Sequence, residues 1–116
     1  MIITNVWNNT PASSTGVLSS NFTTNGGYVQ IFFTGSAWSG SGAAMVGANL
    51  VIDGNVVTSA KVFTNEQGSH KSLVAISLVT KLAVGAHTVA IAFATPQTKI
   101  DHNDLFTLTV TELSFS

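Results

Sequence analysis

Residues 105–115 read "LFTLTVTELSF", and in this stretch apolar side chains alternate with threonines. Successive side chains of an extended strand point to opposite faces, so Phe106, Leu108 and Val110 share one face and the threonines between them share the other. An apolar face backed by a polar one is typical of an antiparallel sheet that covers a core on one side. The stretch therefore predicts a strand of an antiparallel sandwich.

Similar stretches recur along the chain, and short turn-forming segments separate them. They are rich in Val, Ile, Thr and Phe, which favour strands, and no window repeats apolar residues at helical spacing. We expect strands at 2–7, 17–22, 28–34, 44–53, 56–63, 71–82, 86–95 and 105–115. Many short strands with turns between them predict an all-β, antiparallel β-sandwich of jelly-roll type without significant helix.

The composition suits one domain and excludes several classes of partner. We expect a single domain over 1–116, with an N-terminal edge strand and arm over 1–24 and a core over 25–116. Only 8% of the residues are charged, and arginine and cysteine are absent. A chain with no basic patch is a poor partner for nucleic acid, and no apolar run reaches the roughly 20 residues of a membrane span. The first ten residues lack the features of a signal peptide. The compartment stays open, and the polar, uncharged composition favours an extracellular or virion surface.

The connections between the strands indicate which end of the molecule binds a ligand. Neighbouring antiparallel strands alternate in direction, so the long loops 35–43, 64–70 and 96–104 should gather at one end. Loops on a rigid scaffold commonly carry binding residues. The candidate ligand-binding residues at this end are Trp38, Glu66, His70, Asp101, His102, Asn103 and Asp104. Trp38 lies in "TGSAWSGSG" (34–42), where its ring would stack on a sugar face. In the alternative, the ring plugs the end of the sandwich or contacts another copy of the chain.

The segment "DHND" (101–104) raises the question of a metal. Asp101, Asn103 and Asp104 offer the oxygen ligands that calcium prefers, but their spacing does not match an EF-hand loop. Such residues also form turns, because their side chains bond nearby backbone groups. We therefore predict no metal and no cofactor, with calcium as the alternative.

The ionisable residues favour binding over catalysis. No serine lies in a nucleophile-elbow pattern. A carboxylate pair of Glu66 with Asp101 or Asp104 is the alternative, hydrolytic reading. His87 begins the apolar face of a strand, which predicts a hydrogen-bonded histidine at the margin of the core.

Two of the expected strands carry apolar side chains on both faces. In 28–34 and 71–82 the second face would leave a large apolar patch in water unless another surface covers it. Either these are fully covered central strands, or the second face packs on a neighbouring copy. The predicted oligomer face consists of Tyr28, Phe32, Leu73, Ala75 and Val79.

Four segments carry a family resemblance: "GGYVQIFFTGSAW" (26–38), "ANLVIDGNVV" (48–57), "GAHTVAIAF" (85–93) and "NDLFTLTVTEL" (103–113). Together they resemble the compact jelly rolls of the complement C1q and tumour necrosis factor type. The resemblance implies a trimer that packs through apolar sheet faces and binds proteins or sugars. It transfers no functional residue, and an immunoglobulin-like sandwich is the alternative.

These observations lead to one principal hypothesis. The chain is predicted to be a non-enzymatic binding module, a homotrimer whose loops 35–43, 64–70 and 96–104 bind a carbohydrate or a protein. The alternative is a structural component of a virion, a phage tail or a surface assembly.

Overall fold

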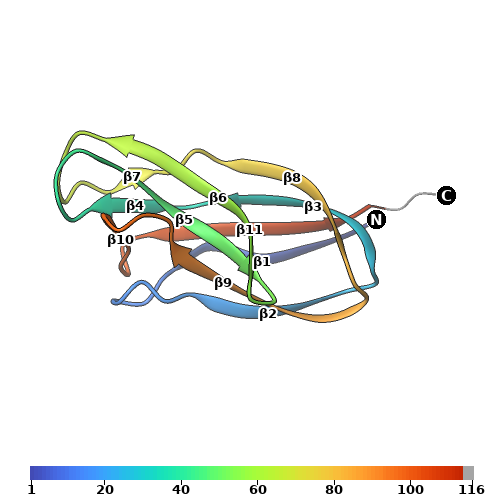
Figure 1. Cartoon of the computed structure of the whole chain (residues 1–116). Coiled ribbons are helices and arrows are strands. Elements are labelled where there is room, and N and C mark those ends of the chain that lie inside the picture. The colour runs from blue at the N-terminus through green and yellow to red at the C-terminus, as the bar shows by residue number, and fades with distance from the viewer. Residues whose placement is uncertain (114–116) are drawn as a thin grey trace.

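The computed structural model describes residues 1–113, and it is a sandwich of β-sheets (Figure 1). Its strands are β1 (Ile2–Pro11), β2 (Ser19–Thr24), β3 (Gly27–Thr34), β4 (Ser36–Ser39), β5 (Ala44–Ile52), β6 (Asn55–Thr64), β7 (Lys71–Ser72), β8 (Ile76–Leu82), β9 (Gly85–Phe93), β10 (Thr98–Lys99) and β11 (Leu105–Glu112). No helix occurs in this part of the chain, so none there is long and apolar enough to cross a membrane.

The strands form two four-stranded antiparallel sheets and one small sheet. The large sheets have the orders β1-β11-β3-β8 and β2-β9-β5-β6, and the small sheet has the order β10-β4-β7. The chain passes repeatedly from one large sheet to the other, and each sheet combines strands that are distant in sequence. Eight strands connected in this way form a jelly roll. The predicted fold class is confirmed.

The core lies between the two large sheets. Val29, Ile31 and Phe33 of β3 are completely buried, and so are Phe106 and Leu108 of β11. This confirms the alternation predicted for residues 105–112. Two aromatic residues of the predicted N-terminal arm, Trp7 and Phe22, also belong to the core.

Trp7 also joins the two sheets by a hydrogen bond. Its indole Nε1 donates to Ser20 Oγ at 2.9 Å, and the two residues lie on β1 of one sheet and β2 of the other. The bond closes the open edge of the sandwich beside the core.

The prediction of a single strand over 71–82 is wrong. The chain forms two strands here, β7 and β8, and residues 73–75 between them belong to neither strand. There the backbone N–H of Leu73 donates to Gly35 O, and that of Val74 donates to Lys61 O. The chain bends because β7 pairs with β4 in the small sheet while β8 pairs with β3 in a large one.

This bend also corrects the predicted oligomer face. Leu73 points into the core and is only 4% exposed, so it cannot contribute to an outer surface. Tyr28, Phe32 and Val79 are 49%, 41% and 57% exposed, and Ala75 is exposed as well. The outer face of β3 and β8 thus carries exposed apolar side chains beside the polar Gln30, Ser77 and Lys81, and Leu73 does not belong to it.

Two of the predicted loops contain short strands. Ser36–Ser39 forms β4 inside loop 35–43, and Thr98–Lys99 forms β10 inside loop 96–104. The two strands pair with each other, with Trp38 opposite Lys99 and Ser39 opposite Thr98. The glycines and serines around Trp38 gave this segment the composition of a loop. The strand that pairs with it, β10, lies some sixty residues away, so the sequence near Trp38 does not indicate the pairing.

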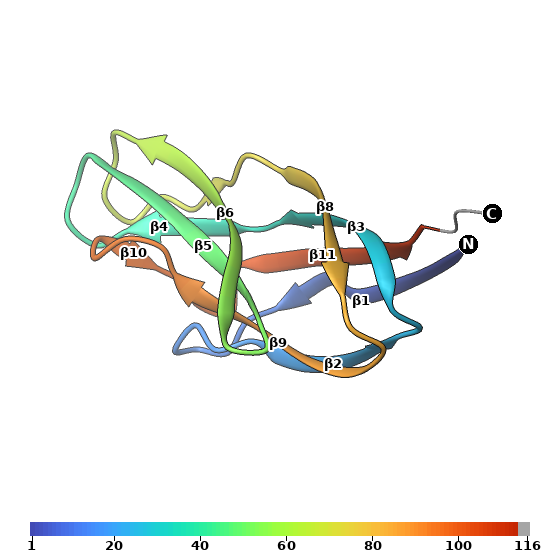
Figure 2. The ribbon, with the colours of Figure 1, turned by 45° about the vertical axis from the view of Figure 1, so that its right-hand side comes forward.

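The long connections gather at one end of the sandwich, as predicted. Ser39 forms a bridge with Gln67, and β4 pairs with both β7 and β10, which brings loops 35–43, 64–70 and 96–104 together (Figures 1 and 2). The turns between β2 and β3 and between β8 and β9 lie at the other end. The predicted hairpin turn between β5 and β6, where Asp53 and Gly54 have φ angles of 52° and 82°, lies nearer the middle of the molecule (Figures 1 and 2). We call the first of these ends the loop end.

Candidate functional site

The loop end contains a network of polar side chains centred on a buried carboxylate. Asp104 is 0% exposed. Its Oδ1 accepts hydrogen bonds from Ser36 Oγ at 2.6 Å and from His70 Nδ1 at 2.7 Å. Its Oδ2 accepts from the backbone N–H of Asp101 at 2.9 Å. Burial of a carboxylate is costly unless donors surround it, and these three donors satisfy that need.

The strand β4 places an aromatic ring beside this network. Ser36 and Trp38 are two residues apart on β4, so their side chains share one face. The Trp38 ring lies 5.8 Å from the His70 ring, centre to centre, at an interplanar angle of 40°. Ser36, Trp38, His70, Asp101 and Asp104 are called the loop-end site below.

The Trp38 indole has one unusual feature. Its Nε1 is the only buried side-chain nitrogen or oxygen in residues 1–113 that has no hydrogen-bond partner. A buried donor without a partner costs stability. Ring contacts, and not a hydrogen bond, therefore hold this side chain in place.

A polar pocket of about 320 Å³ lies next to the loop-end site. It is lined by Asn9, Thr34, Gly35, Ser36, Ser72, Asn103, Leu105 and Thr107. Six of these eight residues carry a hydroxyl or an amide, which can donate and accept hydrogen bonds. Ser36 belongs to both the pocket and the loop-end site. The aromatic ring, the carboxylate network and the pocket of neutral polar groups therefore lie at the same end of the molecule, with Ser36 common to the pocket and the network.

The structure places the seven predicted ligand-binding residues at the loop end in different situations. Trp38, His70, Asp101 and Asp104 are brought together. Asn103 lines the pocket, and its backbone N–H donates to Asp101 Oδ1 at 2.9 Å. The exposed Glu66 pairs with Lys71, with 3.7 Å from Oε1 to Nζ. His102 is exposed to solvent.

Sequence reasoning missed Ser36 and, apart from Asn103, the other residues that line the pocket. Ser36 stands two positions before Trp38 in the stretch that was already singled out, so the strand periodicity alone would have placed both on one face. Asn9 and Thr107 carry no such signal, because they enter the pocket from β1 and β11.

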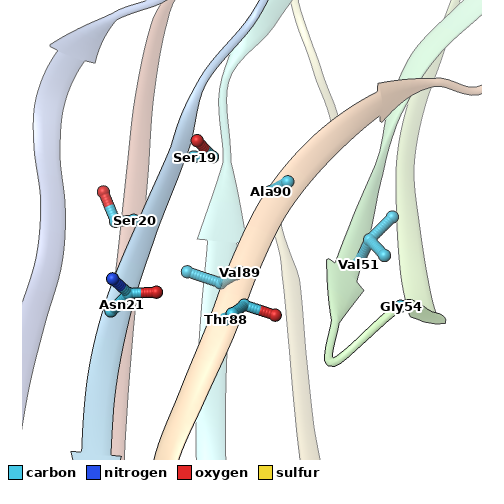
Figure 3. A pocket seen from close by; sticks show the side chains of 8 residues that line it. All are labelled: Ser19, Ser20, Asn21, Val51, Gly54, Thr88, Val89 and Ala90. Carbon is cyan, nitrogen blue, oxygen red and sulfur yellow. The ribbon is translucent and has the colours of Figure 1, made fainter.

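A second pocket, of about 410 Å³, lies on the outer face of the sheet β2-β9-β5-β6 (Figure 3). It is lined by Ser19, Ser20, Asn21, Val51, Gly54, Thr88, Val89 and Ala90. Figure 3 shows Thr88 and Ala90 of β9 between the residues of β2 and Val51 of β5. Four of its lining residues carry a hydroxyl or an amide, namely Ser19, Ser20, Asn21 and Thr88. This pocket is larger than the one at the loop end, but the loop-end pocket has six such residues and lies next to the network of Asp104.

The hydrogen-bonded histidine predicted at position 87 is confirmed, and it lies away from the loop end, beside the hairpin turn. His87 is 5% exposed. Its Nδ1 lies 2.6 Å from Asp53 Oδ2, and its Nε2 lies 2.8 Å from Ala83 O. Both partners accept, so both ring nitrogens donate when Asp53 is ionised. The hydrogen bond to Asp53 raises the pKa of His87, although burial opposes this, and the hydrogen bond from His87 lowers the pKa of Asp53.

We expect this pair to make stability depend on pH. A histidine whose folded pKa is raised stabilises the fold below its unfolded pKa of about 6.5, and this contribution is lost as the pH rises through the folded value. The melting temperature, measured from about pH 6 to about pH 9, should therefore fall as the pH rises above the unfolded pKa of about 6.5. Because Asp53 is half-exposed, solvent screens the pair and the effect should be modest. Asp53→Asn should remove this dependence, since asparagine tolerates the positive φ of the turn. Parallel melting curves for the two proteins across this range would contradict the assignment.

Comparison with known proteins gives matches of structure only. No family model and no curated protein matches the sequence. Among solved structures, dimeric latent PorU from Porphyromonas gingivalis matches with a TM-score of 0.62 and 12% identity, over 97% of this chain and 13% of PorU. A family 35 carbohydrate-binding module from Clostridium thermocellum matches with a TM-score of 0.52 and 16% identity, over 97% of this chain and 92% of the module. The family 35 module of Cellvibrio japonicus Abf62 gives 0.52 and 15%, over 93% and 73%.

These likenesses show the fold. The chain spans a small part of PorU and most of each binding module, so the jelly roll occurs both as part of a large protein and as a small module. The jelly-roll part of the predicted resemblance is confirmed, whereas membership of the C1q family is not shown. The homotrimer and the virion component stay predictions.

Proposed function

We propose that this chain is a non-enzymatic binding module whose ligand is a carbohydrate, bound at the loop end. The observation that carries the proposal is that Ser36, which lines a pocket of hydroxyl and amide groups, stands two residues before Trp38 on the same face of β4. Sugars present apolar C–H faces and many hydroxyls. An aromatic ring packs against the former, and neutral polar side chains bond the latter.

The structural neighbours support the same proposal. The two family 35 modules named above are carbohydrate-binding modules, and this chain covers 92% of one and 73% of the other. The residues of the loop-end site favour binding because the buried carboxylate of Asp104 already accepts hydrogen bonds from both His70 and Ser36. The serine hydroxyl donates to the carboxylate and not to the histidine, which is the wrong order for a nucleophile activated by a base.

We include the predicted homotrimer in this proposal. Tyr28 and Phe32 of β3, Val79 of β8 and Ala75 just before β8 are exposed on the outer side of the sheet β1-β11-β3-β8. We expect trimer formation through this side of the sheet. A protein ligand at the loop end and a structural role in a virion, a phage tail or a surface assembly remain the alternatives.

The test of the proposal is binding to a glycan array by variants of Trp38. Trp38→Ala should reduce binding at least tenfold, which corresponds to about 1.4 kcal/mol, because the stacking surface is lost. Trp38→Phe should retain most of the binding and should not lower the melting temperature by much, since it removes the unpaired Nε1 donor. Val51→Ala, in the second pocket, is the matched control. If Trp38→Ala binds as well as the wild type, Trp38 does not contribute to the binding site. If only Val51→Ala loses binding, the ligand binds at the second pocket and not at the loop end.

A further inference from the structure

His70 and Asp101 face each other at a distance that a hydrogen bond does not explain. His70 Nε2 lies 3.9 Å from Asp101 Oδ2, whereas hydrogen bonds between nitrogen and oxygen end near 3.2 Å. The other ring nitrogen, Nδ1, bonds the carboxylate of Asp104 at 2.7 Å. A carboxylate only accepts, so in the neutral ring the proton is on Nδ1 and Nε2 has a free electron pair. Two electron-pair donors thus face each other, and this arrangement favours a cation between them.

Both donors are held in place by groups behind them. Asp104 is fully buried and is fixed by Ser36 Oγ and by the backbone of Asp101, so it holds the His70 ring in one orientation. Asp101 Oδ1 accepts from the backbone N–H of Asn103, which leaves Oδ2 directed toward His70. A carboxylate that bonds the second nitrogen of a histidine is the usual support of a metal-binding imidazole, because it fixes the tautomer and makes the ring a better ligand.

We propose that His70 Nε2 and Asp101 Oδ2 bind a divalent transition-metal ion of the zinc class, with Asp104 as the carboxylate that orients His70. Metal–ligand distances near 2.0–2.2 Å place two ligands of one tetrahedral ion about 3.3 to 3.6 Å apart. The observed 3.9 Å is a few tenths of an ångström longer, so binding an ion requires the His70 and Asp101 side chains to approach each other slightly. The three side chains offer ligand atoms that all lie within 4.8 Å of one another. An imidazole nitrogen suits zinc, nickel or copper, and calcium or magnesium prefers oxygen ligands alone.

The exposure of the two ligands suits a reversible site. The side chains of His70 and Asp101 are 34% and 23% exposed, so an ion can reach them from solvent. Because the chain supplies two ligands, the ion keeps further positions for water. The sequence-based prediction offered calcium on Asp101, Asn103 and Asp104. In the present site the ligands are His70 and Asp101, Asp104 supports His70 from behind, and Asn103 is not a ligand.

The test is calorimetric titration of the chelator-treated full chain with zinc chloride near neutral pH and without any glycan, so that it does not depend on the proposed function. We expect saturable binding of one ion. His70→Ala and Asp101→Asn should each weaken it at least tenfold, and Asp104→Asn should weaken it by about 10–100-fold, as is usual for a carboxylate behind a metal ligand. His102→Ala is the matched control and should bind as the wild type does, since His102 is an exposed histidine one residue from Asp101.

Several outcomes would overturn the site. One is the absence of saturable zinc binding, and another is binding that survives both His70→Ala and Asp101→Asn. A third is a nitrogen NMR spectrum in which both ring nitrogens of His70 stay protonated when zinc is added, because the cation between the carboxylates would then be the imidazolium itself. If Asp104→Asn fails to fold, the partly exposed Asp101 still decides the question. Calcium chloride should produce no comparable binding, and equal affinity for calcium would also contradict the assignment.

Discussion

Replacing Trp7 with alanine should lower the free energy of unfolding by about 3–5 kcal/mol, the usual cost of removing a large buried aromatic side chain. Trp7 is 2% exposed and belongs to the core between the sheets. Its removal leaves a cavity and also leaves Ser20 Oγ without the donor of their 2.9 Å hydrogen bond. Urea unfolding followed by circular dichroism measures the effect.

Trp7→Phe is the matched control for this substitution. It keeps an aromatic ring in the core and removes the indole N–H, so it separates the hydrogen bond, worth about 1 kcal/mol, from the packing. We expect its loss of stability to lie well below that of Trp7→Ala. A loss below about 1 kcal/mol for Trp7→Ala would show that β1 contributes little to the core, contrary to its burial.

The second large effect is expected at Gly35, where the chain passes from β3 to β4. A Cβ atom at this position would lie 2.2 Å from Phe106 Cδ1. Phe106 is completely buried and stacks on Phe33, so it has no room to move away. Gly35→Ala should therefore destabilise the fold by about 1–3 kcal/mol, the cost of overpacking a core. The melting temperature measures it.

A double-mutant cycle tests the cause of this second effect. Phe106→Leu removes the ring atoms that the new methyl group would meet, so the combined variant should be more stable than the sum of the single changes predicts. Strict additivity would mean that Gly35 is required by its backbone and not by contact with Phe106. Because Gly35 also lines the loop-end pocket, this contact joins the core to the proposed ligand surface.

The fold could be predicted from the sequence because strand periodicity is a local signal. The alternation in residues 105–112 requires one wet and one buried face, and the structure has both. The gathering of the long loops followed from the alternating direction of neighbouring strands. That argument placed Trp38 near His70 and Asp104 without any knowledge of their contacts.

The parts of the fold and of the candidate site that were not predicted depend on pairings between distant segments, and the periodicity of a single segment does not indicate its partner. Leu73 lies in an unbroken apolar run, so only the change of partner from β4 to β3 reveals the bend there. Trp38 lies in a segment with the composition of a loop and becomes part of a strand because Lys99 pairs with it. The contact of Ser36 with Asp104 spans 68 positions of sequence, and no local rule predicts it.

The pairing of Ile2 with Glu112 has a practical consequence. These residues lie at the end of the sandwich where β2 turns into β3, and Pro11 and Leu105 pair at the other end, beside the loops. The molecule measures 50 Å along its longest axis and 22 Å across. A reporter protein fused before β1 or after β11, or a bead coupled there, would be attached at the end opposite the loop end and would leave the loops exposed to solvent. Capture measurements should give the same affinity whichever terminus carries the tag.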